Sequence, residues 1–273
     1  MQNQLISEIE RFVRESAANL QEDGVTPYFD QPLIGVAAAT DPLFGEYKQI
    51  IGDFHLTPIE LLPQAASVVC WVLPVTESTR QSNRHQQQFP SRAWARTRDL
   101  GETFNVLLRR HLVEWLEKQG CLALAPQLSA RWQAVELPGS GPASNWSERH
   151  AAYAAGLGTF SLNDALITRR GMAHRLGSVI TDSPLLPTPR NVANYRSNCL
   201  RFSSGGCGLC IARCPVGALS DQGHDKQKCR VYVYGTVPDR VATGYGVKAT
   251  GCGLCQTKVP CEFKIPADSD ATA

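Results

Sequence analysis

The first part of the chain alternates predicted helices with predicted buried strands. Residues 2–20 predict a helix, because their apolar side chains recur at helical spacing. On its apolar face lie Leu5, Ile9, Phe12 and Val13. The apolar runs PLIGVAAA (32–39) and SVVCWVLP (67–74) predict buried strands. Between these strands, Thr57 as N-cap and Pro58 at the first helical position predict a short helix.

The middle of the chain holds the clearest amphipathic pattern, which predicts a helix over 99–119. Its apolar stripe consists of Leu100, Phe104, Leu107, Leu108, Leu112, Trp115 and Leu116. Gly120 is expected to end this helix. Residues 75–97 are polar with little periodicity and predict a loop. The runs at 121–125 and 130–137 predict two further strands.

A region rich in Gly, Pro and Ser, LPGSGPASN, predicts a turn before the next helix. That helix is predicted over 146–155. Asn145 is expected to cap it, and Glu148 is placed to complete a capping box. Gly156 is expected to stop it.

Two more strands, at 165–168 and 175–182, are predicted to be joined by a tight turn around Gly171. A long polar loop with three prolines follows, and it marks the predicted boundary between two domains. Residues 1–182 mix helices and strands, which predicts an α/β or α+β domain whose topology stays open. Residues 183–273 predict a compact, cysteine-rich module with short helices.

Composition narrows the class of protein. The chain has 273 residues, a net charge of +2 and 43% hydrophobic residues, enough for a buried core. The near-neutral charge gives no electrostatic signature for nucleic acid. The first residues resemble neither a signal peptide nor a transit peptide, and no apolar run is long enough to span a bilayer. We therefore expect a cytoplasmic protein without a membrane partner.

The ten cysteines divide into two groups. Cys70 and Cys121 lie in apolar, strand-like runs and are interpreted as core residues. The other eight follow residue 198, and disulfides between them are not expected in a reducing cytosol. Eight cysteines make two complete sets of four.

The cysteine spacing is typical of iron–sulfur proteins. The first run is Cys199-x7-Cys207-x2-Cys210-x3-Cys214-Pro215. Its last three cysteines and the proline match the bacterial ferredoxin pattern, in which the fourth cysteine binds the neighbouring cluster. The pentapeptide GCGLC at 206–210 recurs at 251–255, as expected of a two-cluster module.

The second run is Cys229-x22-Cys252-x2-Cys255-x5-Cys261. We predict two [4Fe–4S] clusters that exchange one ligand each. The first takes Cys199, Cys207, Cys210 and Cys261, and the second takes Cys214, Cys229, Cys252 and Cys255. Paired C-x2-C units also occur in zinc sites, so a structural zinc protein is the non-redox alternative.

Several segments resemble the epoxyqueuosine reductase family. The resemblance lies in SERHAAYAAGLGTFSLNDALIT, in GMAHRLGSVITD and in the cysteine runs, with weaker likeness in LLPQAASVVCWVLP and WLEKQGCLALAP. It covers most of residues 28–263. It implies a bacterial two-[4Fe–4S] ferredoxin-like module, and a cobalamin held between that module and the N-terminal domain and reduced through the clusters.

By this resemblance, one segment is expected to contact the cobalamin. Its residues are Gly156, Leu157, Gly158, Phe160, Ser161 and Asn163. The alternative is that the glycines only cap the preceding helix, as glycines commonly do.

Three departures from the family bear on the substrate. Relatives continue into a helical-repeat domain that helps to hold tRNA, whereas this sequence ends twelve residues after Cys261. Counting back from AGLG, Pro142 stands where the family has a catalytic aspartate. Ser161 replaces a family glycine. A tRNA partner is therefore doubtful at this stage, and a small-molecule substrate is the alternative.

Candidate proton donors near the motif are Glu136, His150 and Tyr153, since a reductive step needs a proton source. The arginines Arg149, Arg169, Arg170 and Arg175 could contact a phosphate or an acidic substrate, although solvated surface charge is their default interpretation.

The leading hypothesis is a cobalamin-dependent iron–sulfur oxidoreductase that receives electrons from an external ferredoxin- or flavodoxin-type donor. One alternative is a cobalamin-handling protein that transforms no organic substrate. The other is a two-cluster electron carrier.

Overall fold

The computed structural model describes residues 1–137 and 141–270. Its centre is a four-stranded antiparallel sheet in the order β1-β2-β8-β3. The strands are β1 (Leu33–Ala38), β2 (Ser67–Pro74), β8 (His174–Thr181) and β3 (Ala123–Leu124). All eight residues of β2 are buried, as its continuous apolar run predicts. The four strands predicted at these positions are confirmed.

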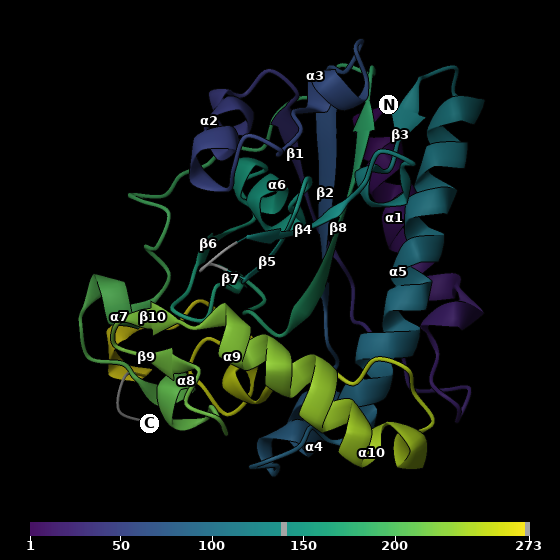
Figure 1. Ribbon diagram of the computed structural model, residues 1–273. Helices are drawn as coiled ribbons and strands as arrows, with labels where there is room; N and C mark the ends of the chain where they lie inside the picture. The colour runs from purple at the N-terminus through teal and green to yellow at the C-terminus, as the bar shows by residue number, and fades with distance from the viewer. Residues whose placement is uncertain (138–140, 271–273) are drawn as a thin grey trace.

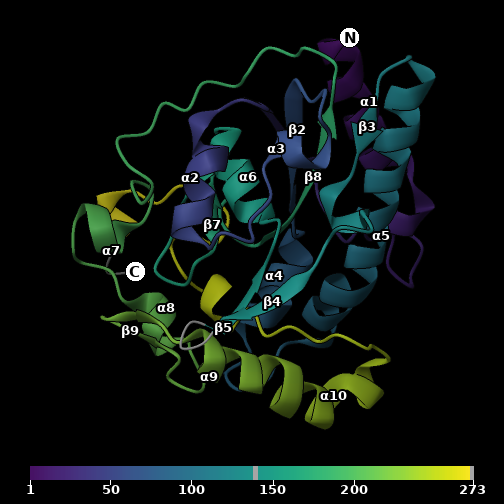
Figure 2. The same cartoon turned by 45° about the horizontal axis from the view of Figure 1, so that its top comes forward.

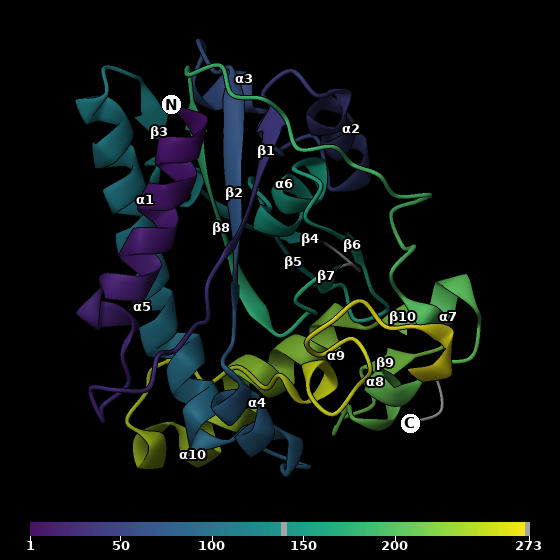
Figure 3. The same ribbon diagram turned by 180° about the vertical axis from the view of Figure 1, so that it is seen from behind.

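Helices cover both faces of the sheet (Figures 1 and 3). On one face pack α1 (Gln2–Glu15) and the long α5 (Arg92–Lys118), whose apolar stripes form a core with alternate residues of β1, β2 and β8. On the other face, α2 (Pro42–Ile50) and α6 (Glu148–Ala154) form a second core. A mixed α/β fold is therefore confirmed, and the sheet is antiparallel.

Helix α3 (Pro58–Leu61) begins as predicted. The Thr57 hydroxyl accepts a hydrogen bond from the Glu60 backbone N–H, and the Glu60 carboxylate accepts one from the Thr57 backbone N–H, which makes a capping box. The loop predicted over 75–97 is wrong in part. It contains α4 (Glu77–Arg84), and α5 already begins at Arg92, capped by Ser91.

The turn predicted over LPGSGPASN is wrong for its second half, which contains β5 (Gly141–Ser144), while residues 138–140 lie outside the described residues. β5 pairs with β4 (Ala134–Leu137) in a separate two-stranded sheet. The predicted cap of the next helix is wrong as well. Ser147, not Asn145, caps α6, and Glu148 points inward to Arg109 instead of completing a capping box.

The turn at Gly171 is confirmed, with a φ of +73° and hydrogen bonds in both directions to Thr168. It does not close a hairpin, because β7 (Leu166–Thr168) pairs with β6 (Gly158–Phe160), while β8 joins the central sheet. The proline-rich segment after β8 runs along the edge strand, where Thr188 exchanges hydrogen bonds with Val36.

The cysteine-rich part lies across one end of the sheet (Figures 1 and 2). Its elements are α7 (Leu200–Ser203), α8 (Leu209–Ala212), β9 (Leu219–Ser220), β10 (Gly223–His224), α9 (Lys226–Val231), a π-helical turn (Tyr232–Thr236) and α10 (Val237–Tyr245). Four 3-10 turns complete the described elements, at Ala17–Asn19, Pro126–Leu128, Leu254–Gln256 and Asp268–Asp270. The domain boundary after residue 182 stays a prediction.

In the described part of the chain, no helix combines the length and the apolar character needed to cross a lipid bilayer.

Candidate functional site

Four of the late cysteines line one small cavity. They are Cys199, Cys207, Cys210 and Cys261. Cys199 directly precedes α7, Cys207 lies in the loop between α7 and α8, Cys210 lies in α8, and Cys261 comes from the end of the second run. Apolar side chains and the polar Ser161, Asn163 and Arg201 complete the wall, and the thiol of Cys261 lies 3.9 Å from the sulfur of Met172.

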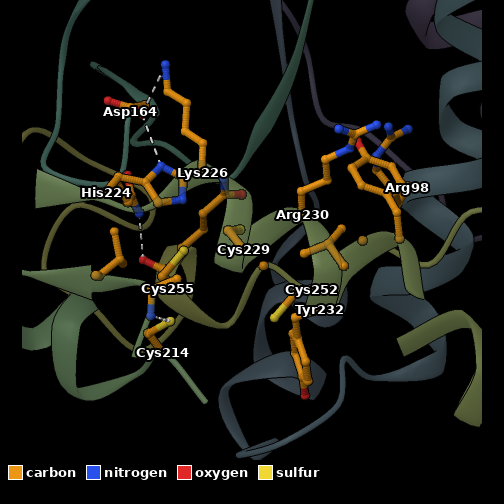
Figure 4. Close-up of a pocket in the computed structure, with 18 of the residues that line it drawn as sticks. Arg98, Asp164, Cys214, His224, Lys226, Cys229, Arg230, Tyr232, Cys252 and Cys255 are labelled. Carbon is orange, nitrogen blue, oxygen red and sulfur yellow. Dashed lines mark hydrogen bonds and ion pairs between the residues drawn. The ribbon is translucent and has the colours of Figure 1, made fainter. Parts of the chain in front are cut away.

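The other four line a larger, adjoining cavity of about 330 Å³ (Figure 4). They are Cys214, Cys229, Cys252 and Cys255. Here too one cysteine, Cys214, comes from the first run and three come from the second. The two cavities therefore divide the eight cysteines into the two crossed sets that the sequence predicts. Their role as cluster ligands stays a prediction.

The thiols of each set influence one another, which shows how close together they lie. Burial raises the pKa of Cys210 to about 12, and the neighbouring Cys199 and Cys207 contribute. Burial likewise raises the pKa of Cys252 to about 12, with contributions from Cys229 and Cys214. Metal binding requires thiolates, so loading such a site releases protons.

The chemistry of the donor set fits an iron–sulfur cluster. All ten cysteines are free thiols. Among the described residues, no three His, Cys, Asp or Glu side chains are close enough together to hold one metal ion. A cubane binds its four thiolates at four separate iron atoms, so its ligands surround a volume instead of meeting at a point.

Asn163 lies between the two cavities and lines both. Its amide donates a hydrogen bond to the Cys255 carbonyl at 3.0 Å. Its amide oxygen accepts from the Ser161 hydroxyl at 2.5 Å. The hydrogen bond from Asn163 to Cys255 joins the β6–β7 connection to the second cysteine run. This connection therefore borders both sets of cysteines.

The larger cavity also contains an acid–base cluster that sequence reasoning missed. Figure 4 shows His224 and Lys226 around Asp164. The His224 Nδ1 lies 3.0 Å from the Asp164 carboxylate. Burial opposes a charge on His224, but the contacts with Asp164 and Cys229 prevail and raise its pKa to about 9. The β10 hairpin and the positive φ of Asp164 bring these residues together, and neither carries a sequence signal.

His174 is a second missed residue of this cavity. Burial lowers the pKa of His174 to about 4, so the ring is neutral. Its Nε2 donates to the Leu166 carbonyl at 2.8 Å, and its buried Nδ1 has no partner among the described residues.

None of the three predicted proton donors lines the larger cavity. The Glu136 carboxylate pairs with Arg230, which does line it. His150 is enclosed between Tyr47 and Phe160, and burial lowers its pKa to about 3. Tyr153 stacks beneath the Arg190 guanidinium. Catalytic roles for these residues stay predictions, which their placement does not support.

The predicted cobalamin contacts do not form one surface. Gly156 and Gly158 are packed against the chain itself. A Cβ at Gly156 would lie 2.8 Å from the Pro189 carbonyl oxygen, and one at Gly158 would lie 2.4 Å from that of Ile167. Leu157 packs onto Gly35 of β1. Close backbone packing therefore accounts for both glycines.

Of the remaining predicted contacts, Phe160 packs between His150 and Tyr153. Ser161 and Asn163 line the cysteine cavities, and only Asn163 lines the larger one. The six residues thus do not fit as a single cobalamin surface, and the larger cavity is the better candidate for a ligand.

No protein-family model matches the chain. Among curated proteins, it is 26% identical over 213 residues to the epoxyqueuosine reductase of Bacillus cereus, covering 74% of the chain and 50% of that protein. It is 22% identical over 279 residues to that of Staphylococcus aureus, covering 94% and 68%. The chain resembles the epoxyqueuosine reductases. It spans about half the length of the first curated relatives it matches.

Solved structures share the fold. A selenomethionine-labelled epoxyqueuosine reductase matches with a TM-score of 0.57 at 21% identity, covering 95% of this chain and 66% of that one. An epoxyqueuosine reductase with a modified tRNA stem loop matches with 0.55 at 20%, covering 98% and 69%. A reductive dehalogenase described as B12-dependent matches with 0.52 at 15%, covering 87% and 31%. The resemblance noted in the sequence is confirmed.

Proposed function

We propose that this protein is a reductase of the epoxyqueuosine reductase type, which holds two [4Fe–4S] clusters and uses a cobalamin. The observation that carries the proposal is the crossed arrangement of the cysteines, in which each cavity receives three thiols from one run and one from the other. Crossed ligands are the pattern of two-cluster ferredoxins. Curated relatives named epoxyqueuosine reductase support the reductase activity.

The protein's own residues would hold the clusters close together. Cys210 and Cys255 belong to different sets, yet they lie near each other: burial raises the pKa of Cys255 most, followed by Cys252 and then by Cys210. Asn163 binds the backbone of Cys255 and borders both cavities. Short separation favours electron transfer between the clusters. The first set lies beside the exposed loop 202–206, which is where an external ferredoxin- or flavodoxin-type donor would approach.

We propose that the cobalamin binds at the mouth of the larger cavity, next to the second set of cysteines. At about 330 Å³, and with the second cluster inside it, only the part of the corrinoid that faces the cysteines would enter this cavity. Its wall combines Trp94, Tyr232 and Tyr234 with polar and charged groups. When bound there, cobalamin would supply a strongly reducing cobalt centre. A B12-dependent relative in fold supports this cofactor.

The relatives make tRNA a stronger candidate substrate than the sequence alone did. The curated relatives are named for epoxyqueuosine, and one solved relative contains an epoxyqueuosine-modified tRNA stem loop. We therefore propose epoxyqueuosine-containing tRNA as the first substrate to test, with a small molecule as the second.

Anaerobic reconstitution tests this proposal. We expect about eight iron and eight sulfide per chain, since two cubanes contain four of each. Cys261→Ser and Cys255→Ser should each lose about half of the iron, whereas Cys121→Ser, outside both sets, should retain all of it. Cobalamin should change its absorption spectrum on binding. Zinc without sulfide in the purified protein would contradict the proposal.

One observation favours a cobalamin-handling protein as a second candidate. Pro142, at the position counted for the family's catalytic aspartate, lines the larger cavity and offers no proton. If this candidate is right, the loaded protein will bind and reduce cobalamin but convert neither epoxyqueuosine tRNA nor another organic acceptor. Product detected by mass spectrometry would exclude it.

A further inference from the structure

The larger cavity carries an excess of positive charge. Five Lys and Arg side chains line it, together with His174 and His224, whereas Asp164 has the one carboxylate among the described residues of its wall. The five are Arg98, Arg149, Arg175, Lys226 and Arg230. They come from α5, α6, β8 and α9, so the fold and not a local charge run brings them together.

Three of these cations are neutralised by the protein. The Arg175 Nε donates to the Glu102 carboxylate at 2.8 Å, and Arg230 pairs with Glu136. Lys226 lies 4.0 Å from Asp164, which also accepts from His224.

Arg98 and Arg149 have no such partner. In residues 1–137 and 141–270, neither forms an ion pair with a carboxylate. Arg149 donates one hydrogen bond, to the Asp164 backbone carbonyl at 2.6 Å. The pKa of Arg98 is lowered, first by repulsion from Arg175 and then by burial. Two guanidinium groups therefore line the cavity near Arg175 without a direct ion pair to a carboxylate of the described residues.

The proposed cluster does not account for this excess. Arg213 and Arg230 directly precede or follow proposed cluster ligands in the chain, next to Cys214 and Cys229 respectively. The aliphatic stem of Arg98 lies against the cysteine loop, 3.0 Å from where a Cβ of Gly251 would be. Figure 4 shows Arg98 and Arg230 across the cavity from Asp164.

We propose that Arg98 and Arg149 bind an anionic oxygen group, a phosphate or carboxylate, of the molecule that occupies this cavity. The planar guanidinium forms paired hydrogen bonds with such groups, and both guanidinium groups line this cavity without a carboxylate partner among the described residues. This inference rests on the proposed function for the nature of the occupant. The anionic group belongs either to the substrate or to the nucleotide tail of a bound cobalamin.

Calorimetric binding to the reconstituted protein in low-chloride buffer tests the site. The probes are inorganic phosphate, benzoate, cobalamin and cobinamide, a corrinoid that lacks the phosphate-bearing tail. Loss of one charged hydrogen bond weakens binding by about ten- to a hundredfold. We expect Arg149→Gln and Arg98→Gln each to weaken phosphate or benzoate binding by that factor, and Arg149→Lys to recover part of it. Arg110→Gln, on an exposed position of α5, should leave binding unchanged.

The corrinoid probes identify the source of the anion. A loss of cobalamin affinity with unchanged cobinamide affinity assigns the site to the cofactor's phosphate. Unchanged affinity for both corrinoids, together with weaker binding of phosphate or benzoate, assigns it to the substrate.

The inference is overturned if Arg149→Gln and Arg98→Gln, folded by circular dichroism, bind all four probes as the wild type does, or if the wild type binds neither phosphate, benzoate nor cobalamin. Iron and sulfide content, measured on the same samples, shows separately whether the proposed clusters are present.

Discussion

Glu102 of α5 pairs with Arg109 and with Arg175, which lines the larger cavity. Replacing Glu102 by glutamine tests how much these two ion pairs contribute to stability. Its carboxylate binds the buried Arg109 at 3.0 Å and the Arg175 Nε at 2.8 Å. Burial alone would raise its pKa, but the two arginines prevail and lower it to about 2 from 4.5. At about 1.4 kcal/mol per pH unit, this difference corresponds to about 3 kcal/mol of folding free energy.

The direction of the pH dependence follows from the lowered pKa of Glu102. The contribution is complete above pH 4.5, where the unfolded carboxyl is ionised, and is lost as the pH falls towards 2. In urea unfolding at pH 7, we expect Glu102→Gln to be less stable than the wild type by about 3 kcal/mol. The difference in unfolding free energy between the wild type and Glu102→Gln should be smaller by about 1.4 kcal/mol at pH 3.5 than at pH 7.

A matched control is Glu15→Gln, which removes a carboxylate paired with exposed arginines at the surface of α1. It should leave the free energy of unfolding nearly unchanged, because exposed ion pairs contribute little. A pH-independent loss in Glu102→Gln, or none, would refute the electrostatic reasoning.

Two further predictions concern stability around the site. Gly253→Ala should destabilise the protein by about 2–5 kcal/mol and lower its iron content, because Gly253 has a φ of +65° and a Cβ would lie 2.0 Å from the Trp94 ring. Gly244→Ala in α10, where nothing lies within 4 Å, should raise the melting temperature slightly; equal effects of the two would contradict this. Ser147→Ala should cost about 1 kcal/mol in urea unfolding through loss of the α6 cap, and an unchanged midpoint would mean that the cap is dispensable.

The sequence predicts best where a short segment decides its own structure. The apolar run of β2 and the stripe of α5 could be recognised because burial of their side chains determines both. The cap of α3 could be recognised because Thr57 and Pro58 act locally. The two sets of cysteines that line the cavities were predictable for a related reason, since the first run has the ferredoxin spacing and the GCGLC motif recurs.

Features built from distant segments carried no such signal. Arg98, Arg149 and Arg175 lie on three separate elements, and each resembles an ordinary surface charge in the sequence. Ser147 and Asn145 are both good caps, and the sequence favoured the wrong one. Asn145 instead uses its side chain to bind the backbones of Arg131 and Gln133 at the start of β4.

Helix α4 explains why several features that the sequence did not predict lie near the site. Its sequence is polar, but it buries Thr79, Arg80 and Asn83 against the rest of the protein. Asn83 donates to the Thr257 hydroxyl at 3.0 Å, and Arg84 binds the buried Glu262 carboxylate at 2.7 Å.

These contacts hold the segment that carries the last cysteine. Glu262 follows Cys261 directly and also accepts from the Lys258 backbone at 2.8 Å. Arg213, beside Cys214, donates to the Gln86 carbonyl at 2.7 Å, just beyond α4. Both crossing cysteines therefore lie next to residues fixed by α4 or by the loop after it. A helix that pairs with polar groups instead of an apolar core has no periodic signal, and for the same reason it can hold a polar, ligand-bearing loop in place.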